Sequence, residues 1–120
     1  MTSFPDSRMR RLRGSEPMRN LARETRLSIK EFIYPVFVGH GQGIKDPIEP
    51  MPGQFQMSLD ILSEDVGEAA ELGIPAVLLF GLPAEKDPLG TEGYDPEGIV
   101  QEAIRMIKKN HPDMMVVTDV

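Results

Sequence analysis

The sequence predicts an α/β protein in which strands and helices alternate behind an N-terminal arm. Near-continuous apolar runs over residues 32–38, 76–81 and 114–120 are typical of strands buried on both faces, as in parallel sheets. The segments between these runs place apolar residues at helical spacing. The order arm–strand–helix–strand–helix–strand therefore predicts a parallel sheet with right-handed crossovers.

Residues 1–28 form the predicted arm, because they show no sustained periodicity. Residues 1–30 carry eight basic and three acidic side chains, a charge of +5, whereas the other 90 residues carry five and sixteen, a charge of −11. This separation of positive and negative charge favours docking of the arm on an acidic protein surface such as a sister subunit. The alternative is an arm that is exposed to solvent and binds nothing. Phe4 is the one aromatic residue of the segment, so no stacking platform supports nucleic-acid binding. Four apolar residues could anchor the arm on another surface: Leu12, Met18, Leu21 and Leu27.

The first predicted strand, Phe32–Val38, contains Pro35, which removes a backbone donor and indicates a local bulge or an edge position. A loop rich in Gly and Pro is predicted over residues 39–53. Its run Gly39–Gly43 follows a strand but lacks the glycine spacing of a phosphate-binding loop. We therefore expect a flexible connection in which His40 faces solvent.

A helix is predicted over residues 59–72, where one stripe gathers apolar side chains: Leu59, Leu62, Val66, Ala69 and Ala70. Gly73 is placed to end this helix in the left-handed conformation. The second strand, Ala76–Gly81, leads into a polar loop over residues 82–94.

The second helix is predicted to open with Asp95 as N-cap and Pro96 as its first residue. Its apolar face consists of Val100, Ala103, Ile104 and Ile107. Asp87, Glu92 and Asp95 are expected to be solvated or capping groups rather than catalytic ones.

Two residues near the ends of strands are candidates for a functional site. In strand–helix repeats, chemistry lies past the carboxyl ends of the strands. Asp119 stands near the end of the third strand, over residues 114–120, where it could orient a cationic group or relay a proton. A structural ion pair is the alternative, since a buried carboxylate is costly unless paired. Phe80, which ends the second strand, is expected to pack at the rim or to contact substrate.

Composition restricts the class of protein. Apolar residues make up 40% and charged residues 27% of the 120 residues, which is ordinary for a globular protein, and we expect no membrane span and a cytoplasmic location. The sequence contains no cysteine, so disulfides and thiolate ligands are excluded within it. His40 and His111 lack the spacing of metal ligands, and no metal site is expected in this segment.

Six stretches occur in a characteristic order: Arg23–Leu27, Phe32–Val38, Met51–Gly53, Glu71–Val77, Leu79–Gly81 and Val116–Val120. This ordered set resembles the N-terminal part of the porphobilinogen synthase family, also called δ-aminolevulinate dehydratase. The unusual Tyr34–Pro35 pair inside a strand belongs to the set.

The resemblance implies a TIM (β/α)8 barrel, of which this chain would supply an arm, residues 1–28, and the first three βα units, residues 29–120. A complete barrel of this kind needs eight strands and about 250 residues, so the barrel is expected to be truncated here. The resemblance further implies an arm that wraps a neighbouring subunit, in homo-oligomers built from dimers that assemble to octamers.

The resemblance also implies a hydro-lyase reaction of haem and other tetrapyrrole biosynthesis. Two molecules of 5-aminolevulinate condense, with loss of two waters, to give porphobilinogen. The family uses two Schiff-base lysines on later strands, so this segment alone is expected to be inactive. Asp119 matches the family's aspartate at the end of the third strand, with an implied role in supporting those lysines and orienting the substrate amine, and Phe80 is expected to line the pocket. A divalent metal, zinc or magnesium, is implied for the full-length enzyme.

Two other functions remain open at this point. The segment could be a non-catalytic interaction module that docks through its basic arm. It could also belong to another Schiff-base barrel enzyme, such as an aldolase.

Overall fold

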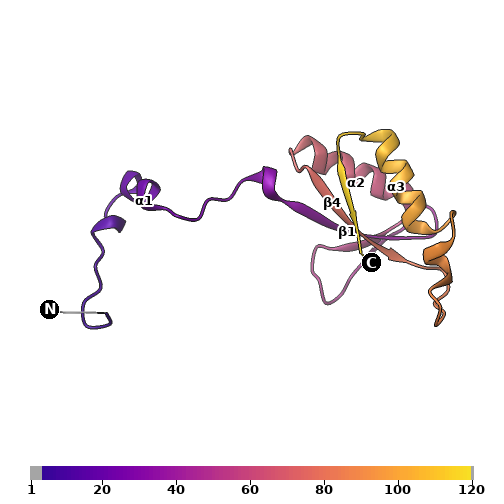
Figure 1. Ribbon diagram of the computed structural model, residues 1–120, viewed down its shortest axis with the longest axis horizontal. Coiled ribbons are helices and arrows are strands. Elements are labelled where there is room, and N and C mark those ends of the chain that lie inside the picture. The colour runs from indigo at the N-terminus through magenta and orange to yellow at the C-terminus, as the bar shows by residue number, and fades with distance from the viewer. Residues whose placement is uncertain (1–3, 120) are drawn as a thin grey trace.

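The computed structural model describes residues 4–119, in which an N-terminal arm leads to a body built around one sheet (Figure 1). The five strands lie in the order β2-β3-β1-β4-β5. Their bounds are β1, Ile33–Gly39; β2, Lys45–Pro47; β3, Phe55–Met57; β4, Ala76–Leu82; and β5, Met115–Thr118. Strands β3, β1, β4 and β5 run parallel, and only β2 is antiparallel to its neighbour β3. The three predicted strands are therefore confirmed as β1, β4 and β5 of the parallel part of a mixed sheet, to which β3 also belongs.

Strand β2 corrects the prediction of a loop over residues 39–53, and β3 follows in residues for which no element was predicted. They form a short hairpin in which the N–H of Ile48 donates to the carbonyl of Gln54 at 3.0 Å. β3 then pairs with the end of β1, with Phe37 opposite Gln56. Three-residue strands carry too little periodicity to detect in a sequence. Pairing of β2 with β3, and of β3 with β1, satisfies their backbone groups.

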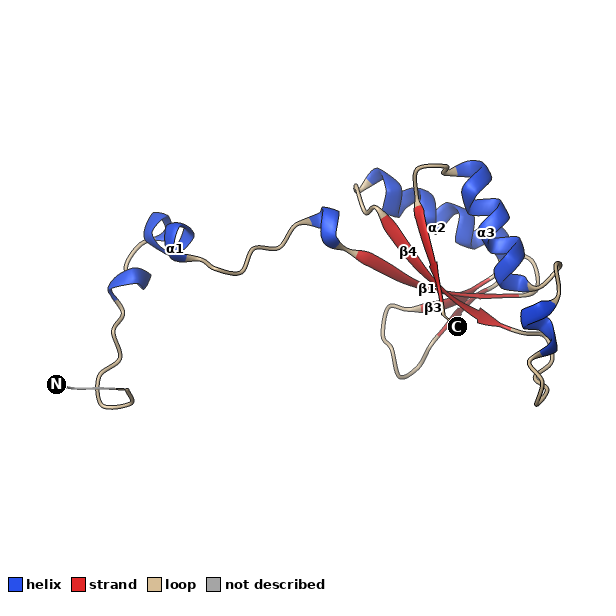
Figure 2. Ribbon diagram, in the orientation of Figure 1, coloured by secondary structure: helices blue, strands red, loops and turns tan. Residues whose placement is uncertain are grey.

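Helices α2, Leu59–Glu71, and α3, Ile99–Asn110, lie side by side on one face of the sheet (Figure 2). Their buried residues pack with alternate strand residues in one core: Val36, Val38, Leu62, Val66, Val77, Leu79, Ile99, Ala103 and Ile107. The predicted stripe of α2 is confirmed, and Gly73 follows it with φ of +87°, as the left-handed cap requires.

The start of α3 corrects a second prediction. The helix begins at Ile99, with Gly98 as N-cap, and not at Asp95 and Pro96. Asp95 instead follows the 3-10 helix η3, Thr91–Tyr94, and its Oδ1 accepts from the N–H of Glu97 at 2.8 Å. The chain therefore makes one more turn, closed by the N–H of Gly98 donating to the Asp95 carbonyl, before α3 starts.

The arm contains more regular structure than the predicted extended segment. It holds the 3-10 helix η1, Arg11–Arg13, and helix α1, Glu16–Ala22, and the 3-10 helix η2, Ile29–Glu31, follows it before β1. Ser15 caps α1 by accepting from the N–H of Met18 at 3.4 Å, and Pro17 stands in its first turn. Seven residues are too few to show an amphipathic period, so this helix was not predicted. None of the described arm helices has a buried residue.

The face of the sheet opposite α2 and α3 carries a second set of apolar side chains. Within residues 4–119, no helix covers this face (Figure 2). Ile33 and Met115 on it are exposed, and the rings of Phe37 and Phe80 stack with centroids 5.1 Å apart. Strand residues alternate between the two faces, so Phe37 and Phe80 point away from the helix-covered core.

Candidate active site

The carboxyl ends of β1, β4 and β5 meet at one edge of the sheet, because these strands are parallel neighbours. Phe37 pairs with Phe80, and Leu79 pairs with Thr118. Extending the β4–β5 register by one residue beyond Leu79 and Thr118 places Asp119 opposite Phe80. The structure therefore brings the two predicted site residues to neighbouring strand ends.

Phe80 is half-buried and its ring lies at 20° to that of Phe37. This stack fixes the orientation of the Phe80 ring at the rim of the sheet. The following Gly81 is required by packing, because a Cβ atom there would clash with Val100 of α3. The end of β4 is thus fixed on both faces of the sheet, by the Phe37–Phe80 stack on one face and by the close approach of Gly81 to α3 on the other.

Asp119 directly follows β5 and is exposed. It lines a cavity of about 490 Å³ together with Phe80, Thr118, Glu92 and Gln101. The remaining walls come mostly from apolar residues of β4 and α3. An apolar cavity with a few convergent polar groups is the usual form of a small-molecule site. A carboxylate in such a place can hold an amine or another cationic group.

Among residues 4–119, no cluster of three or more His, Cys, Asp or Glu side chains could hold a metal ion. In the same part of the chain, no helix is long and apolar enough to cross a membrane.

Glu92 and His40 form a contact that sequence reasoning missed. His40 Nε2 lies 2.6 Å from Glu92 Oε1. The His40 side chain is 40% exposed, so the expectation of a solvent-facing His40 is confirmed, but its partner was not predicted. The His40 hydrogen bond is the main cause that lowers the pKa of Glu92, and the N–H groups of Ile99 and Ala84 lower it further. The bond to Ile99 confirms the predicted capping role of Glu92. A signal was available, because the two loops follow parallel neighbours and must meet at one edge.

Asp87 also acts as predicted, as a group that orders its own turn. Its Oδ1 accepts from the N–H groups of Leu89 and Thr91, both at 3.0 Å. Hydrogen bonding from the side chain and backbone of Thr91 lowers the pKa of the Asp87 carboxyl.

Comparison with known proteins places this geometry in context. Residues 6–120 match the family described as delta-aminolevulinic acid dehydratase. The chain is 49% identical over 112 residues to the delta-aminolevulinic acid dehydratase of Halalkalibacterium halodurans, which covers 93% of this chain and 34% of that protein. It is 48% identical over 113 residues to the enzyme of the same name from Bacillus subtilis, covering 94% and 35%.

A solved structure shares the fold. It is the delta-aminolevulinic acid dehydratase (porphobilinogen synthase) of Toxoplasma gondii ME49 in complex with the reaction product porphobilinogen. The two chains superpose with a TM-score of 0.86 at 35% identity, over 95% of this chain and 33% of the other. This chain thus spans about a third of the length of the relatives it matches. These matches confirm the family resemblance and the prediction of an α/β unit that forms part of a (β/α)8 barrel.

Proposed function

This chain belongs to the delta-aminolevulinic acid dehydratase family, and from that premise we propose that it forms part of a porphobilinogen synthase. The proposed reaction condenses two 5-aminolevulinate molecules to porphobilinogen with loss of two waters. The match over residues 6–120 carries this proposal. It favours a synthase over the two alternatives, an interaction module and a Schiff-base aldolase. A cytoplasmic location is part of the same proposal.

Asp119 is the proposed polar contact of this segment with the reaction. The carboxylate lines the cavity at the carboxyl edge, where a substrate amine or a catalytic lysine would carry positive charge. We assign Asp119 the support of the two Schiff-base lysines that the family resemblance implies on later strands, and the orientation of the substrate amine. Phe80, held by its stack on Phe37, is proposed as an apolar wall of the same pocket.

A divalent metal, zinc or magnesium, is proposed for the full-length enzyme, and residues 4–119 hold no cluster of three or more His, Cys, Asp or Glu side chains that could bind it. No step assigned here to Asp119 or Phe80 requires that metal.

The arm is proposed to join subunits of a homo-oligomer, in dimers that assemble to an octamer. Its exposed apolar residues, among them Leu12, Leu21 and Leu27, and its basic charge suit the acidic body of a second copy. Deletion of residues 1–19 from the full-length protein should shift assembly toward smaller species, measured by light scattering. An unchanged mass would contradict this role.

The central test compares two aspartates at opposite ends of one strand in the full-length protein that carries residues 1–120. Asp119→Asn should lower kcat/KM for 5-aminolevulinate by at least about a hundredfold, as expected for a group that assists proton transfer or charge stabilisation. Asp113→Asn is the matched control, because Asp113 is also exposed but precedes β5.

Equal activity of the two variants would remove Asp119 from the site. Absence of 5-aminolevulinate turnover in the unaltered full-length protein would overturn the proposed function itself. The 120-residue segment expressed alone should show no turnover.

A further inference from the structure

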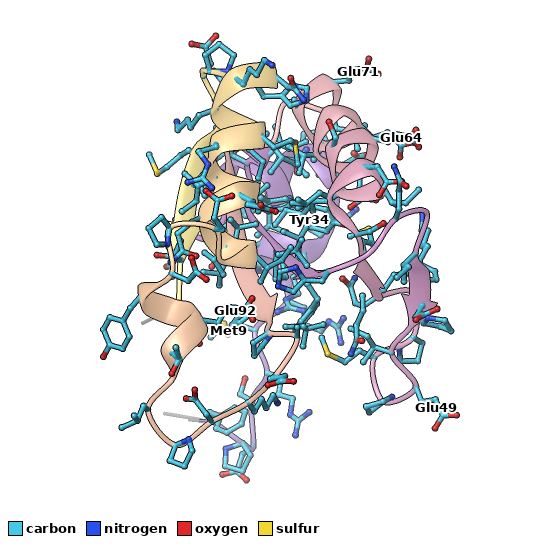
Figure 3. All side chains as sticks on the ribbon, turned by 90° about the vertical axis from the view of Figure 1, so that its right-hand side faces the viewer. Met9, Tyr34, Glu49, Glu64, Glu71 and Glu92 are labelled. Carbon is cyan, nitrogen blue, oxygen red and sulfur yellow. The ribbon has the colours of Figure 1, made fainter. Side chains whose placement is uncertain are left out.

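The carboxylate of Glu92 gathers hydrogen bonds from three separate segments. Its Oε1 accepts from His40 Nε2 at 2.6 Å and from the N–H of Ile99 at 3.3 Å, and its Oε2 accepts from the N–H of Ala84 at 2.9 Å. His40 follows β1, Ala84 follows β4 and Ile99 begins α3. Figure 3 shows Glu92 near the base of α3, beside the end of β4. One side chain therefore ties the first βα loop to the second loop and to the helix after it.

The loop that carries His40 is fastened at its other end to the start of α2. Ile44 donates its N–H to Ser58 Oγ at 2.9 Å, and Gly43 donates its N–H to Asp60 Oδ2, also at 2.9 Å. The fully buried Ser58 hydroxyl donates to Asp60 Oδ1 at 2.6 Å. Polar contacts thus hold this loop at two places. Gly43 and Ile44 bind the start of α2, and His40 binds Glu92, which also binds the start of α3.

This polar connection adjoins the candidate site. Glu92 lines the cavity of about 490 Å³ that Phe80 and Asp119 share. His40 lines a neighbouring cavity of about 230 Å³, and Pro83 lines both. Movement of the loop over residues 82–94 would therefore change the wall of the cavity that contains Asp119.

We propose that Glu92 is a positioning residue that, through His40, fixes the first two βα loops to each other and thereby holds the rim of the Asp119 cavity. The catalytic use of that rim rests on the proposed function, whereas the fastening of the loops does not. A carboxylate suits the role because two oxygens can accept all three donors, whereas an amide has one acceptor oxygen. A side chain that merely capped α3 would need only its bond to Ile99, and His40 would then make no difference.

Amide hydrogen exchange in the full-length protein tests the fastening. Glu92→Ala should speed exchange of peptides covering residues 84–99 by at least about tenfold, since it removes a charged acceptor shared by two backbone amides. His40→Ala should speed the same peptides by a smaller factor, and His40→Gln, which keeps a donor near the position of Nε2, should restore slow exchange. Glu85→Ala provides the matched control, because Glu85 is an exposed carboxylate of the same loop.

The double variant H40A/E92A should exchange no faster than E92A, because both substitutions break one connection. The proposal is overturned if E92A exchanges like E85A, or if H40A and H40Q both behave like the unaltered protein.

Kinetics separate this inference from the proposed function. With 5-aminolevulinate as substrate, E92A should lower kcat/KM by a smaller factor than D119N, and H40Q should recover the part lost in H40A. D119N should lose activity without changing exchange over residues 84–99. Faster exchange in E92A with undiminished kcat/KM would overturn the role at the cavity rim. If the full-length protein shows no turnover at all, the proposed function fails, and the exchange results still decide whether Glu92 fastens the loops.

Discussion

The arm and the body contain similar apolar side chains but place them in opposite environments. Leu21 of α1 is 81% exposed, whereas Leu62 of α2 is completely buried. The described arm helices bury no residue, while the body closes a core between α2, α3 and the sheet. Figure 1 shows the arm reaching away from the body, and the longest extent of the chain is 67 Å. Apolar residues in the body therefore stabilise its own fold, and those in the arm remain available for a second surface.

The largest expected effect is the loss of stability when a leucine of the body is shortened, compared with the same change in the arm. Leu62→Ala should lower the free energy of unfolding by about 2–5 kcal/mol, because it removes buried methyl groups and leaves a cavity between α2 and the sheet. Leu21→Ala, the same change in the arm, should alter the stability of the body by less than about 0.5 kcal/mol. Denaturant unfolding followed by circular dichroism measures both. A large loss in Leu21→Ala would show that the arm packs on the body and would break the comparison.

The same contrast explains which features could be predicted from the sequence. The stripe of α2 and the apolar runs of β1, β4 and β5 were predicted because burial against a core leaves a period in the sequence. Gly73 could be placed at the end of α2 because its left-handed φ favours glycine. The same run of apolar residues predicted that Asp119 lies near the end of the third strand, and the structure places it directly after β5.

Features set by contacts between distant segments were not predicted, because they depend on which strands pair and not on a local pattern. The hairpin of β2 and β3 depends on the pairing of β3 with β1, and strands of three residues are too short for a period to be read from the sequence. Helix α3 starts at Ile99 because Glu92 accepts the N–H of that residue, which made Asp95 and Pro96 a misleading start signal. His40 and Glu92 lie 52 residues apart and meet only through the parallel pairing of β1 with β4.

Ser58 is the N-cap of α2 in the body, and Ser15 is the N-cap of α1 in the arm. Their substitution compares the loss of a side-chain hydrogen bond in the two regions. Ser58→Ala should cost about 1–3 kcal/mol, because the hydroxyl is fully buried and its loss leaves the N–H of Ile44 without an acceptor. Ser15→Ala in the arm removes an exposed bond to the N–H of Met18, so it should weaken α1 and leave unfolding of the body unchanged. Thermal unfolding of the two variants, monitored by circular dichroism, gives the measurement. Equal shifts in the two variants would mean that the arm and the body unfold together.

The smallest expected effect concerns the contact that joins β1 to α2. Tyr34 lies between the sheet and the helices (Figure 3), and its hydroxyl donates to Asp65 Oδ2 at 2.9 Å. Tyr34→Phe should cost about 1 kcal/mol near neutral pH, the usual net value of one intramolecular hydrogen bond. Tyr94→Phe is the control, because the Tyr94 side chain is 85% exposed.

The difference in unfolding free energy between the unaltered protein and Tyr34→Phe should depend on pH, and this dependence tests whether the hydrogen bond to Asp65 causes it. Burial, and then the hydrogen bond to Asp65, raise the pKa of Tyr34 from 10.0 to about 12. The folded protein therefore holds the phenolic proton more tightly than the unfolded chain does. This contribution to stability is fully present below pH 10 and is lost as the pH rises toward 12. The unfolding free energy of the unaltered protein should fall toward that of Tyr34→Phe over this interval, whereas its difference from Tyr94→Phe stays constant. A constant difference from Tyr34→Phe as well would show that the contact between β1 and α2 does not depend on the protonated phenol, and that apolar packing alone holds the helix layer on the sheet.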